Sequence, residues 1–222
     1  MTFSLVGRCN RTGMLGVAVT SSSVCVASRC AWARSGVGAV ATQNLTDPAL
    51  GALALDLLER GLAPSVVCEM LVRADPYPEH RQHLLIDRHG ETAAYSGAKA
   101  LAVHAQATGP FCVAAGNILR SDCVPPAMVE RFALHPEQDL DLRLIDALVA
   151  GLEAGGEVRE LRSAGLLVVD TEHWPVIDLR VDEHATPLAE LARIGEIYRP
   201  LRAGCVLRAT RPHLHVPDIR PT

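Results

Sequence analysis

Small polar and apolar side chains alternate over residues 2–7, as they do in a half-buried β-strand. Residues 10–13 (Asn-Arg-Thr-Gly) are typical of a turn, and residues 14–19 form a second, largely apolar run. These segments predict an antiparallel hairpin. After a stretch rich in small residues, positions 37–42 are almost entirely Gly, Ala and Val, which predicts a third strand buried on both faces.

Apolar residues then recur at helical spacing. Asp47-Pro48 is a typical helix start, and the apolar repeat that follows it extends to Gly61. Ser65 is the expected cap of a second helix, which ends before Asp75-Pro76. The same spacing predicts three later helices, at 126–132, 140–154 and 188–198, the second ended by Gly155-Gly156 and the third by Pro200.

Shorter apolar runs complete the pattern, with a hairpin over 82–86 and 92–95 and further strands at 111–114, 166–169 and 176–181. Strands and helices come in groups, which argues against a doubly wound parallel sheet. We therefore expect an α+β fold in which antiparallel sheets lie between helical layers. Residues 1–202 are assigned to a single domain. Residues 203–222, which contain three prolines and show no periodicity, are predicted to form an extended C-terminal arm.

The composition excludes several classes of partner. A formal net charge of -4 leaves no basic excess to neutralise phosphates, so neither nucleic acid nor an anionic membrane is expected. No apolar run approaches the ~20 residues that span a bilayer. Because the first residues do not resemble a signal peptide, we expect a cytoplasmic protein. The seven cysteines are scattered without a CxxC pair, which predicts reduced thiols and neither a metal nor another cofactor.

Conventional catalytic motifs are missing: the chain has no Gly-x-Ser-x-Gly elbow, phosphate loop or GxGxxG motif. His213 and His215 are a weak candidate for a metal pair, and solvent exposure is the favoured interpretation. Asp178, Arg180 and Asp182 share one strand face, where a salt-bridge ladder is favoured over a catalytic role.

Thr2 stands out by its position. Removal of Met1 would leave its hydroxyl beside a free α-amine, whose ordinary pKa of about 8 lets the neutral amine accept the hydroxyl proton. One residue would then supply both nucleophile and general base. If Met1 is retained, Thr2 has no free amine.

Several strings carry a family resemblance: Thr-Phe-Ser-Leu-Val at 2–6, Gly-Val-Ala-Val at 16–19 followed by Ser21, Gly-Val-Gly-Ala-Val-Ala-Thr-Gln at 36–43, Asp-Pro-Ala-Leu-Gly at 47–51, Arg-Gln at 81–82, Gly-Asn-Ile-Leu at 116–119 and Asp-Leu-Arg-Val-Asp at 178–182. They resemble an uncharacterised prokaryotic family, a domain of unknown function with an N-terminal-nucleophile (Ntn) hydrolase-like fold. The resemblance extends from Thr2 to about His184. It implies a four-layer αββα sandwich.

In that fold the active cleft would lie at the end of the first strand, between the sheets. The candidate catalytic residues are Thr2, Gln43, Asn44 and Asn117, the last three facing a developing oxyanion. The candidate substrate-binding residues are Ser21, Arg34 and Glu157. Arg29 or Arg34 would supply the cation that keeps the Thr2 amine neutral in amidases of this class. Alternatively, Gln43 and Asn117 satisfy backbone groups in turns, and Arg34 is a structural ion-pair partner.

Two positions depart from the family pattern. After the double glycine the family usually has a string similar to Asp-Lys-Arg-Gly-Arg-Gln-Ser, whereas this chain has Glu157 and keeps only Arg159 and Ser163. Ala115 stands where a Gln often precedes the Gly-Asn pair. A polar site has therefore been altered in two places.

Three hypotheses remain open. The first is an amidohydrolase that acts through Thr2 on a small amide. The second is a non-catalytic module that binds a small ligand or forms an oligomer, and the third is a hydrolase that uses a serine of 21–23. A homo-oligomer is expected in each case.

Overall fold

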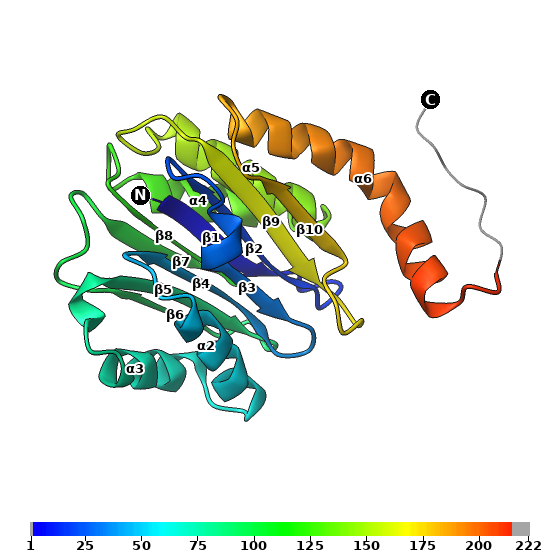
Figure 1. Ribbon diagram of the computed structural model, residues 1–222, viewed down its shortest axis with the longest axis horizontal. Coiled ribbons are helices and arrows are strands. Elements are labelled where there is room, and N and C mark those ends of the chain that lie inside the picture. Colours follow the sequence, from blue (N-terminus) through cyan, green and yellow to red (C-terminus); the bar gives the residue numbers. More distant parts are fainter. Residues whose placement is uncertain (1, 215–222) are drawn as a thin grey trace.

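Ten strands form two antiparallel sheets in the computed structural model, which describes residues 2–214 (Figure 1). The six-stranded sheet has the order β10 (Ile177–Val181), β9 (Ser163–Val169), β2 (Leu15–Ser21), β1 (Thr2–Arg8), β8 (Cys112–Asn117) and β7 (Ala105–Gly109). The four-stranded sheet has the order β3 (Ala31–Arg34), β4 (Gly38–Asn44), β5 (Arg81–Asp87) and β6 (Thr92–Ser96). The prediction of a mixed α/β fold with antiparallel sheets is confirmed.

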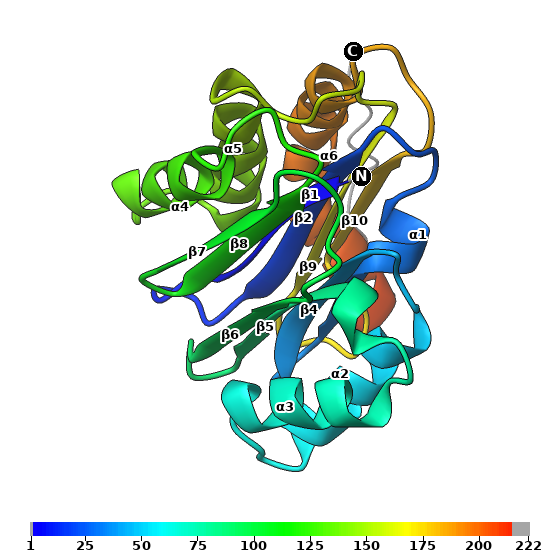
Figure 2. The ribbon, with the colours of Figure 1, turned by 90° about the vertical axis from the view of Figure 1, so that its left-hand side faces the viewer.

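Helices cover the outer face of each sheet, and the inner faces of the two sheets pack on each other (Figure 2). The helices on the six-stranded sheet are α4 (Val124–Leu134), α5 (Leu140–Glu153) and the first part of α6 (Pro187–Thr210). Those on the four-stranded sheet are α2 (Ala49–Glu59) and α3 (Pro64–Ala74). Two short elements, α1 (Ala27–Cys30) and the 3-10 helix η1 (Pro78–His80), belong to connecting segments.

Strand alternation divides the core between these layers, because successive side chains point to opposite faces. In β1, Phe3 and Leu5 pack among the helices, whereas Val6 packs between the sheets. Small residues on the inner faces, including Ala39 and Ala41, allow the two sheets to approach closely. The inter-sheet layer is therefore apolar along most of its length, and its polar residues gather at the end where β1 begins.

Most predicted elements are present, with differences at specific positions. The two hairpins and all five predicted helices are found, and Gly155 and Gly156 end α5 with φ values of 120° and 61°. Ser65 does not cap α3: Ala63 holds the cap position, and Pro64 starts the helix. The strands β3 and β7 were not predicted, because their sequences are short and rich in Ala.

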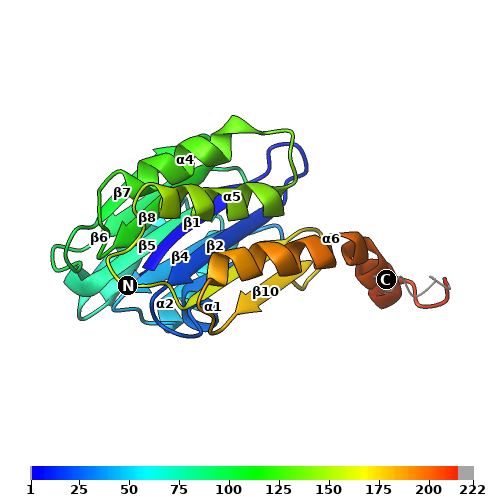
Figure 3. The same ribbon diagram turned by 90° about the horizontal axis from the view of Figure 1, so that it is seen from above.

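The last helix is longer than predicted. Helix α6 continues through Pro200 to Thr210, so the extended arm predicted from residue 203 is wrong over 203–210. Proline removes one helical hydrogen bond and bends a helix without necessarily ending it. The helix changes direction near its middle, and its second half extends beyond the sheets (Figures 1 and 3). Ion pairs from Arg199 and Arg202 to the buried Asp141, at 3.1 and 3.8 Å, hold the bend against α5.

Residues 215–222, the outer part of that arm, lie outside the described residues together with Met1. His215 is therefore not described, and residues 2–214 contain no group of three metal-ligating side chains. None of the helices in this range has the length and apolar character needed to cross a membrane.

A neutral histidine is buried under α3. His83 in β5 faces the helices, stacks on Tyr95 with ring centroids 6.1 Å apart, and makes no hydrogen bond to residues 2–214 through either ring nitrogen. Burial lowers its pKa from 6.5 to about 4; Asp75 opposes this and Arg81 adds to it. The folded state therefore strongly favours the uncharged imidazole.

We predict a histidine-dependent loss of stability in acid. Because the folded pKa of His83 lies below its ordinary value, its contribution is fully present above pH 6.5 and is lost as the pH falls toward 4. The difference amounts to about 3 kcal/mol of unfolding free energy. Urea denaturation at several pH values should show this component in the wild type and not in His83→Phe, which keeps the ring stacking. If the unfolding free energies of the two proteins changed with pH in the same way, the prediction would be contradicted.

Candidate functional site

A cavity of about 360 Å³ opens at the end of the inter-sheet layer where β1 begins. Thr2 contributes the hydroxyl group nearest the start of the chain and is only 4% exposed. The wall combines the ends of β1, β2 and β4 with the α1 segment and the start of β5. Its residues are Thr2, Ser21, Ser23, Val26, Arg29, Cys30, Asn44, Leu45, Thr46 and Arg81.

The Thr2 hydroxyl is held by its cross-strand neighbour. In the sheet register Thr2 lies between Ser21 of β2 and Asn117 of β8. Its Oγ1 donates a hydrogen bond to Ser21 Oγ at 3.3 Å, and that oxygen also accepts the backbone N–H of Ser23 at 3.0 Å. Because Thr2 and Val6 share the inner face of β1, the hydroxyl faces the space between the sheets.

A buried row of amide side chains lies next to Thr2. Gln82 is its centre and is completely buried. Its Nε2 donates to the Gly116 carbonyl at 3.1 Å and to Ser96 Oγ at 2.9 Å. Its Oε1 accepts from Gln43 Nε2 at 2.6 Å and from Asn117 Nδ2 at 3.1 Å. Gln82 thus uses all its hydrogen-bonding capacity to join the two sheets.

The Gly116 carbonyl fixes the orientation of every amide in this row. A carbonyl only accepts, so Gln82 must present its Nε2 to Gly116 and its Oε1 to the other amides. Gln43 and Asn117 must then present nitrogen to Gln82. Gln43 Oε1 is left to accept from Ser4 Oγ, at 2.7 Å. Asn117 Oδ1 is left buried and accepts no hydrogen bond from residues 2–214.

A buried carboxylate closes the end of β1. Glu157, 3% exposed, forms a backbone bridge with Leu119 just past β8, and its Oε2 accepts the N–H of Ser22 just past β2 at 3.1 Å. Because β8 and β2 flank β1, the carboxylate lies across the line of β1 beyond Thr2. Its Oε1 is buried and has no hydrogen-bond partner in the described part of the chain. Burial raises the pKa of Glu157, and the hydrogen bonds from Ser22 oppose this.

Two arginines line the cavity, and only one of them is neutralised. Arg81 Nε lies 2.6 Å from Asp75 Oδ2, and this pairing lowers the pKa of Asp75. Arg29 donates instead to the carbonyls of Cys25 and Val24, each at 3.0 Å. No carboxylate of residues 2–214 forms an ion pair with Arg29. The cavity wall therefore carries a net positive charge.

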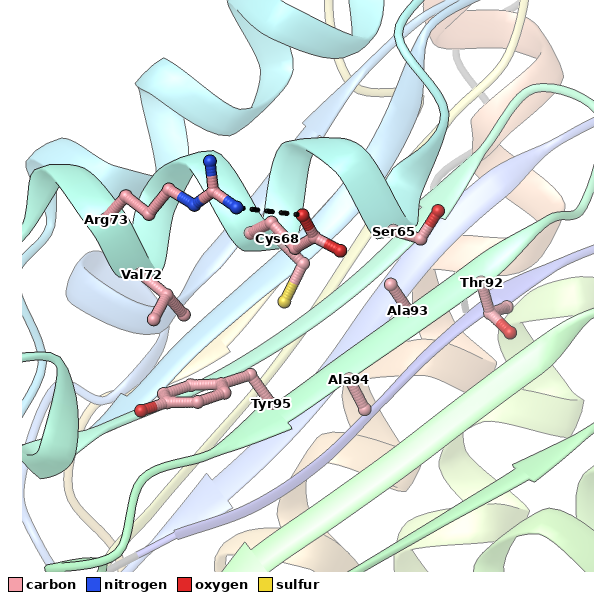
Figure 4. A pocket seen from close by; sticks show the side chains of 9 residues that line it. Ser65, Cys68, Val72, Arg73, Thr92, Ala93, Ala94 and Tyr95 are labelled. Atoms are coloured by element: carbon pink, nitrogen blue, oxygen red, sulfur yellow. Dashed lines mark ion pairs between the residues drawn. The ribbon is translucent and has the colours of Figure 1, made fainter.

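A larger hollow, of about 590 Å³, lies between α3 and β6 on the outer face of the four-stranded sheet (Figure 4). Its candidate nucleophile is Cys68. Burial raises the pKa of this thiol to about 11, so it is protonated near neutral pH and a weak nucleophile. Arg73 in the same wall is paired with Glu69 at 3.7 Å. We therefore place the candidate site at Thr2.

The family comparison covers this site. Residues 2–191 match the model of a family described as a family of unknown function (DUF1028). The chain belongs to the DUF1028 family. The crystal structure of protein SPO2555 from Silicibacter pomeroyi, assigned to the same family, is similar to it with a TM-score of 0.82 and 28% sequence identity over 89% of this chain and 88% of that chain. The predicted family resemblance is confirmed.

Two solved structures of Anbu proteins are similar to this chain at a much lower level. Anbu (ancestral β-subunit) from Yersinia bercovieri aligns with a TM-score of 0.41 and 12% identity, over 99% of this chain and 100% of that one. Anbu from Hyphomicrobium sp. strain MC1 also gives 0.41, with 10% identity over 98% and 100% of the two chains. No curated protein is significantly similar in sequence.

The structure of this DUF1028 protein brings together most of the residues predicted to form a site. Thr2, Ser21 and Asn44 line the cavity, together with Arg29. Asn44 has φ 70°; its Nδ2 donates to the His80 carbonyl and its Oδ1 accepts the Leu101 N–H. The amide of Asn44 therefore holds the loops that form the wall, in addition to facing the cavity.

The remaining predicted residues occupy different places. Gln43 and Asn117 belong to the buried row, and Glu157 closes β1. Arg34 does not line the cavity. It pairs with Asp56 and Glu59 of α2, at 2.8 and 2.7 Å, as expected from the alternative interpretation of Arg34 as a structural ion-pair partner.

Sequence reasoning did not identify Arg81 and Gln82 as part of the site. The signal in the sequence was a pair of polar residues at the end of one otherwise apolar strand, β4, and another pair at the start of the next, β5. Register pairs Asn44 with Arg81 and Gln43 with Gln82, but this pairing was not known from the sequence.

We predict that Gln82 carries a large share of the stability of this end of the domain. Gln82→Leu leaves the buried nitrogens of Gln43 and Asn117 and the Gly116 carbonyl without their partner, and should lower the unfolding free energy by about 3 kcal/mol or more. Urea denaturation measures the loss. The matched control is Gln138→Leu in the turn before α5, away from this row, which should change stability by less than about 1 kcal/mol. Equal losses would rule out the row as a buried network.

Proposed function

We propose that this DUF1028 protein is an amidohydrolase of the Ntn type, in which Thr2 attacks a small amide after cleavage of the Met1–Thr2 bond. The layered arrangement of helices and sheets then corresponds to an Ntn-like αββα sandwich. One observation carries the proposal: the Thr2 hydroxyl begins a central strand, faces the inter-sheet space and lines a polar cavity. This is where a nucleophile with its own α-amine can meet a substrate.

The reaction follows from these groups. The Thr2 α-amine accepts the hydroxyl proton as Oγ1 attacks the amide carbon, and the resulting tetrahedral intermediate carries a negative oxygen. The C–N bond then breaks, the leaving amine takes the proton from the α-ammonium, and an ester to Thr2 remains. Water hydrolyses the ester to a carboxylic acid, again with the α-amine as base.

Two buried hydrogen-bond acceptors support the proposed position of the Thr2 α-amine. Glu157 Oε1 and Asn117 Oδ1 both lie at the end of β1, and neither accepts a hydrogen bond from residues 2–214. A buried acceptor without a donor is costly. An α-ammonium at Thr2 has three N–H donors, so it can satisfy both oxygens and be fixed in orientation beside Oγ1. Glu157 and Asn117 are thus proposed as positioning residues for the general base.

We predict that activity depends on Thr2 and on the removal of Met1. The intact mass of protein expressed in cells should show complete loss of Met1, and a panel of small amides should include substrates. Thr2→Ala should lower kcat/KM at least about a thousandfold, whereas Thr2→Ser should keep a substantial part of it. The matched control is Thr20→Ala: this threonine of β2 hydrogen-bonds the Ser163 carbonyl and should leave kcat/KM nearly unchanged.

Retention of Met1 on active protein, or full activity in Thr2→Ala, would overturn the assignment of Thr2. Ligand binding without turnover by processed protein would favour the second candidate function, a small-ligand-binding module. Activity that depends on Ser21, Ser22 or Ser23 and not on Thr2 would favour the internal-serine hydrolase.

We predict that Glu157 acts on the rate through the α-amine. Glu157→Gln keeps the shape and the acceptor for Ser22 but removes the charge that favours the ammonium form. The kcat should fall by about a hundredfold with KM little changed. The acid limb of the pH profile of kcat/KM should move to lower pH, because the amine then loses its proton more easily. Glu153→Gln, on the exposed end of α5, is the control. An unshifted pH profile would contradict this role.

A further inference from the structure

We infer that the substrate of the proposed reaction carries a carboxylate group near its scissile amide, and that Arg29 binds this carboxylate. The identity of the substrate rests on the proposed function, whereas binding of a carboxylate at Arg29 can be tested without turnover.

Arg29 is held in place by its backbone and by part of its side chain. Its carbonyl accepts hydrogen bonds from Trp32 Nε1 at 3.3 Å and from Thr42 Oγ1 at 3.4 Å. Nη1 and Nη2 each donate to one carbonyl, of Cys25 and Val24. A guanidinium has five N–H donors, so donors remain for a ligand. The side chain is thereby oriented before any ligand enters.

The other titratable groups in the wall leave the charge of Arg29 uncompensated. Arg81 is paired with Asp75, whose side chain is 1% exposed, so that pair adds no net charge. Burial raises the pKa of Cys30 to about 11, which keeps its thiol neutral. No Asp or Glu is among the described residues that line the cavity. Among the side chains of the described residues that line the cavity, the net charge is therefore the single positive charge of Arg29.

Size and polarity define the ligand further. A volume of about 360 Å³ is near the lower limit for small-molecule sites. Among the described residues that line the cavity, only Val26, Cys30 and Leu45 contribute apolar side chains, which argues against a large hydrophobic acyl group. The planar fork of Arg matches a carboxylate, and a charge-assisted hydrogen bond is about twice as strong as a neutral one. A small, polar amide with one carboxylate meets these conditions.

The test compares a carboxylate with its neutral counterpart. Calorimetry on Thr2→Ala protein, in a buffer without carboxylate or phosphate, measures binding of N-acetylglycine and of N-acetylglycinamide. We expect the carboxylate to bind about tenfold tighter or more. Arg29→Gln should remove this preference, and Arg29→Lys should keep part of it because the charge remains. The matched control is Arg34→Gln, an arginine paired outside the cavity, which should leave the preference intact.

The outcomes separate this inference from the proposed function. Equal binding of the two compounds, binding of neither, or a preference that survives Arg29→Gln would overturn the carboxylate site even if amides are hydrolysed. An Arg29-dependent preference supports the site even if no amide is hydrolysed, and in that case only the proposed reaction fails. With active enzyme, the same ratio should appear in kcat/KM for matched acid and amide substrates.

Discussion

The hydrogen bond from Gln82 to the Gly116 carbonyl is the interaction on which the geometry of the site depends. It joins the two sheets at their polar end, and it determines which atom every neighbouring amide presents. Reversing Gln82 would place two carbonyl oxygens against each other and leave the nitrogens of Gln43 and Asn117 facing a donor. The orientation that leaves Asn117 Oδ1 available near Thr2 is therefore a consequence of one backbone carbonyl.

The place of β1 in the sheet supplies the second constraint. Because β1 lies between β2 and β8, its first residue is enclosed on both sides by strand ends. If β1 were an edge strand of the sheet, its first residue would be exposed to solvent. Here Thr2 is buried, and Glu157 covers the remaining direction through its contacts with Ser22 and Leu119. The Thr2 hydroxyl thereby has the fixed surroundings that the proposed reaction requires of a nucleophile.

The sequence predicted the fold better than the site. Periodicity located the helices and the hairpins, since each is encoded by local spacing and by Gly or Pro at its ends. Local rules failed at α6, a helix that continues through Pro200 and is paired with Asp141 of α5 on both sides of that proline. The site depends on cross-strand register, which is not local: Gln82 and Arg81 look like ordinary polar residues until pairing with β4 places them beside Gln43 and Asn44. The ion-pair partners of Arg34 could not be identified from the sequence for the same reason, because they lie on α2 more than twenty positions away.

Charge around Thr2 is divided between two sides. The Glu157 carboxylate lies beyond the start of β1, and Arg29 lines the cavity. In the proposed reaction the first group stabilises a positive α-amine, and the second binds the carboxylate inferred for the substrate. Exchanging the two charges would repel both the amine and that carboxylate. In the proposed attack step, the proton moves from the Thr2 hydroxyl to the α-amine, on the side of the Glu157 carboxylate. The attraction between Glu157 and the amine therefore becomes stronger as the transition state is approached, which is the condition for catalysis rather than mere binding.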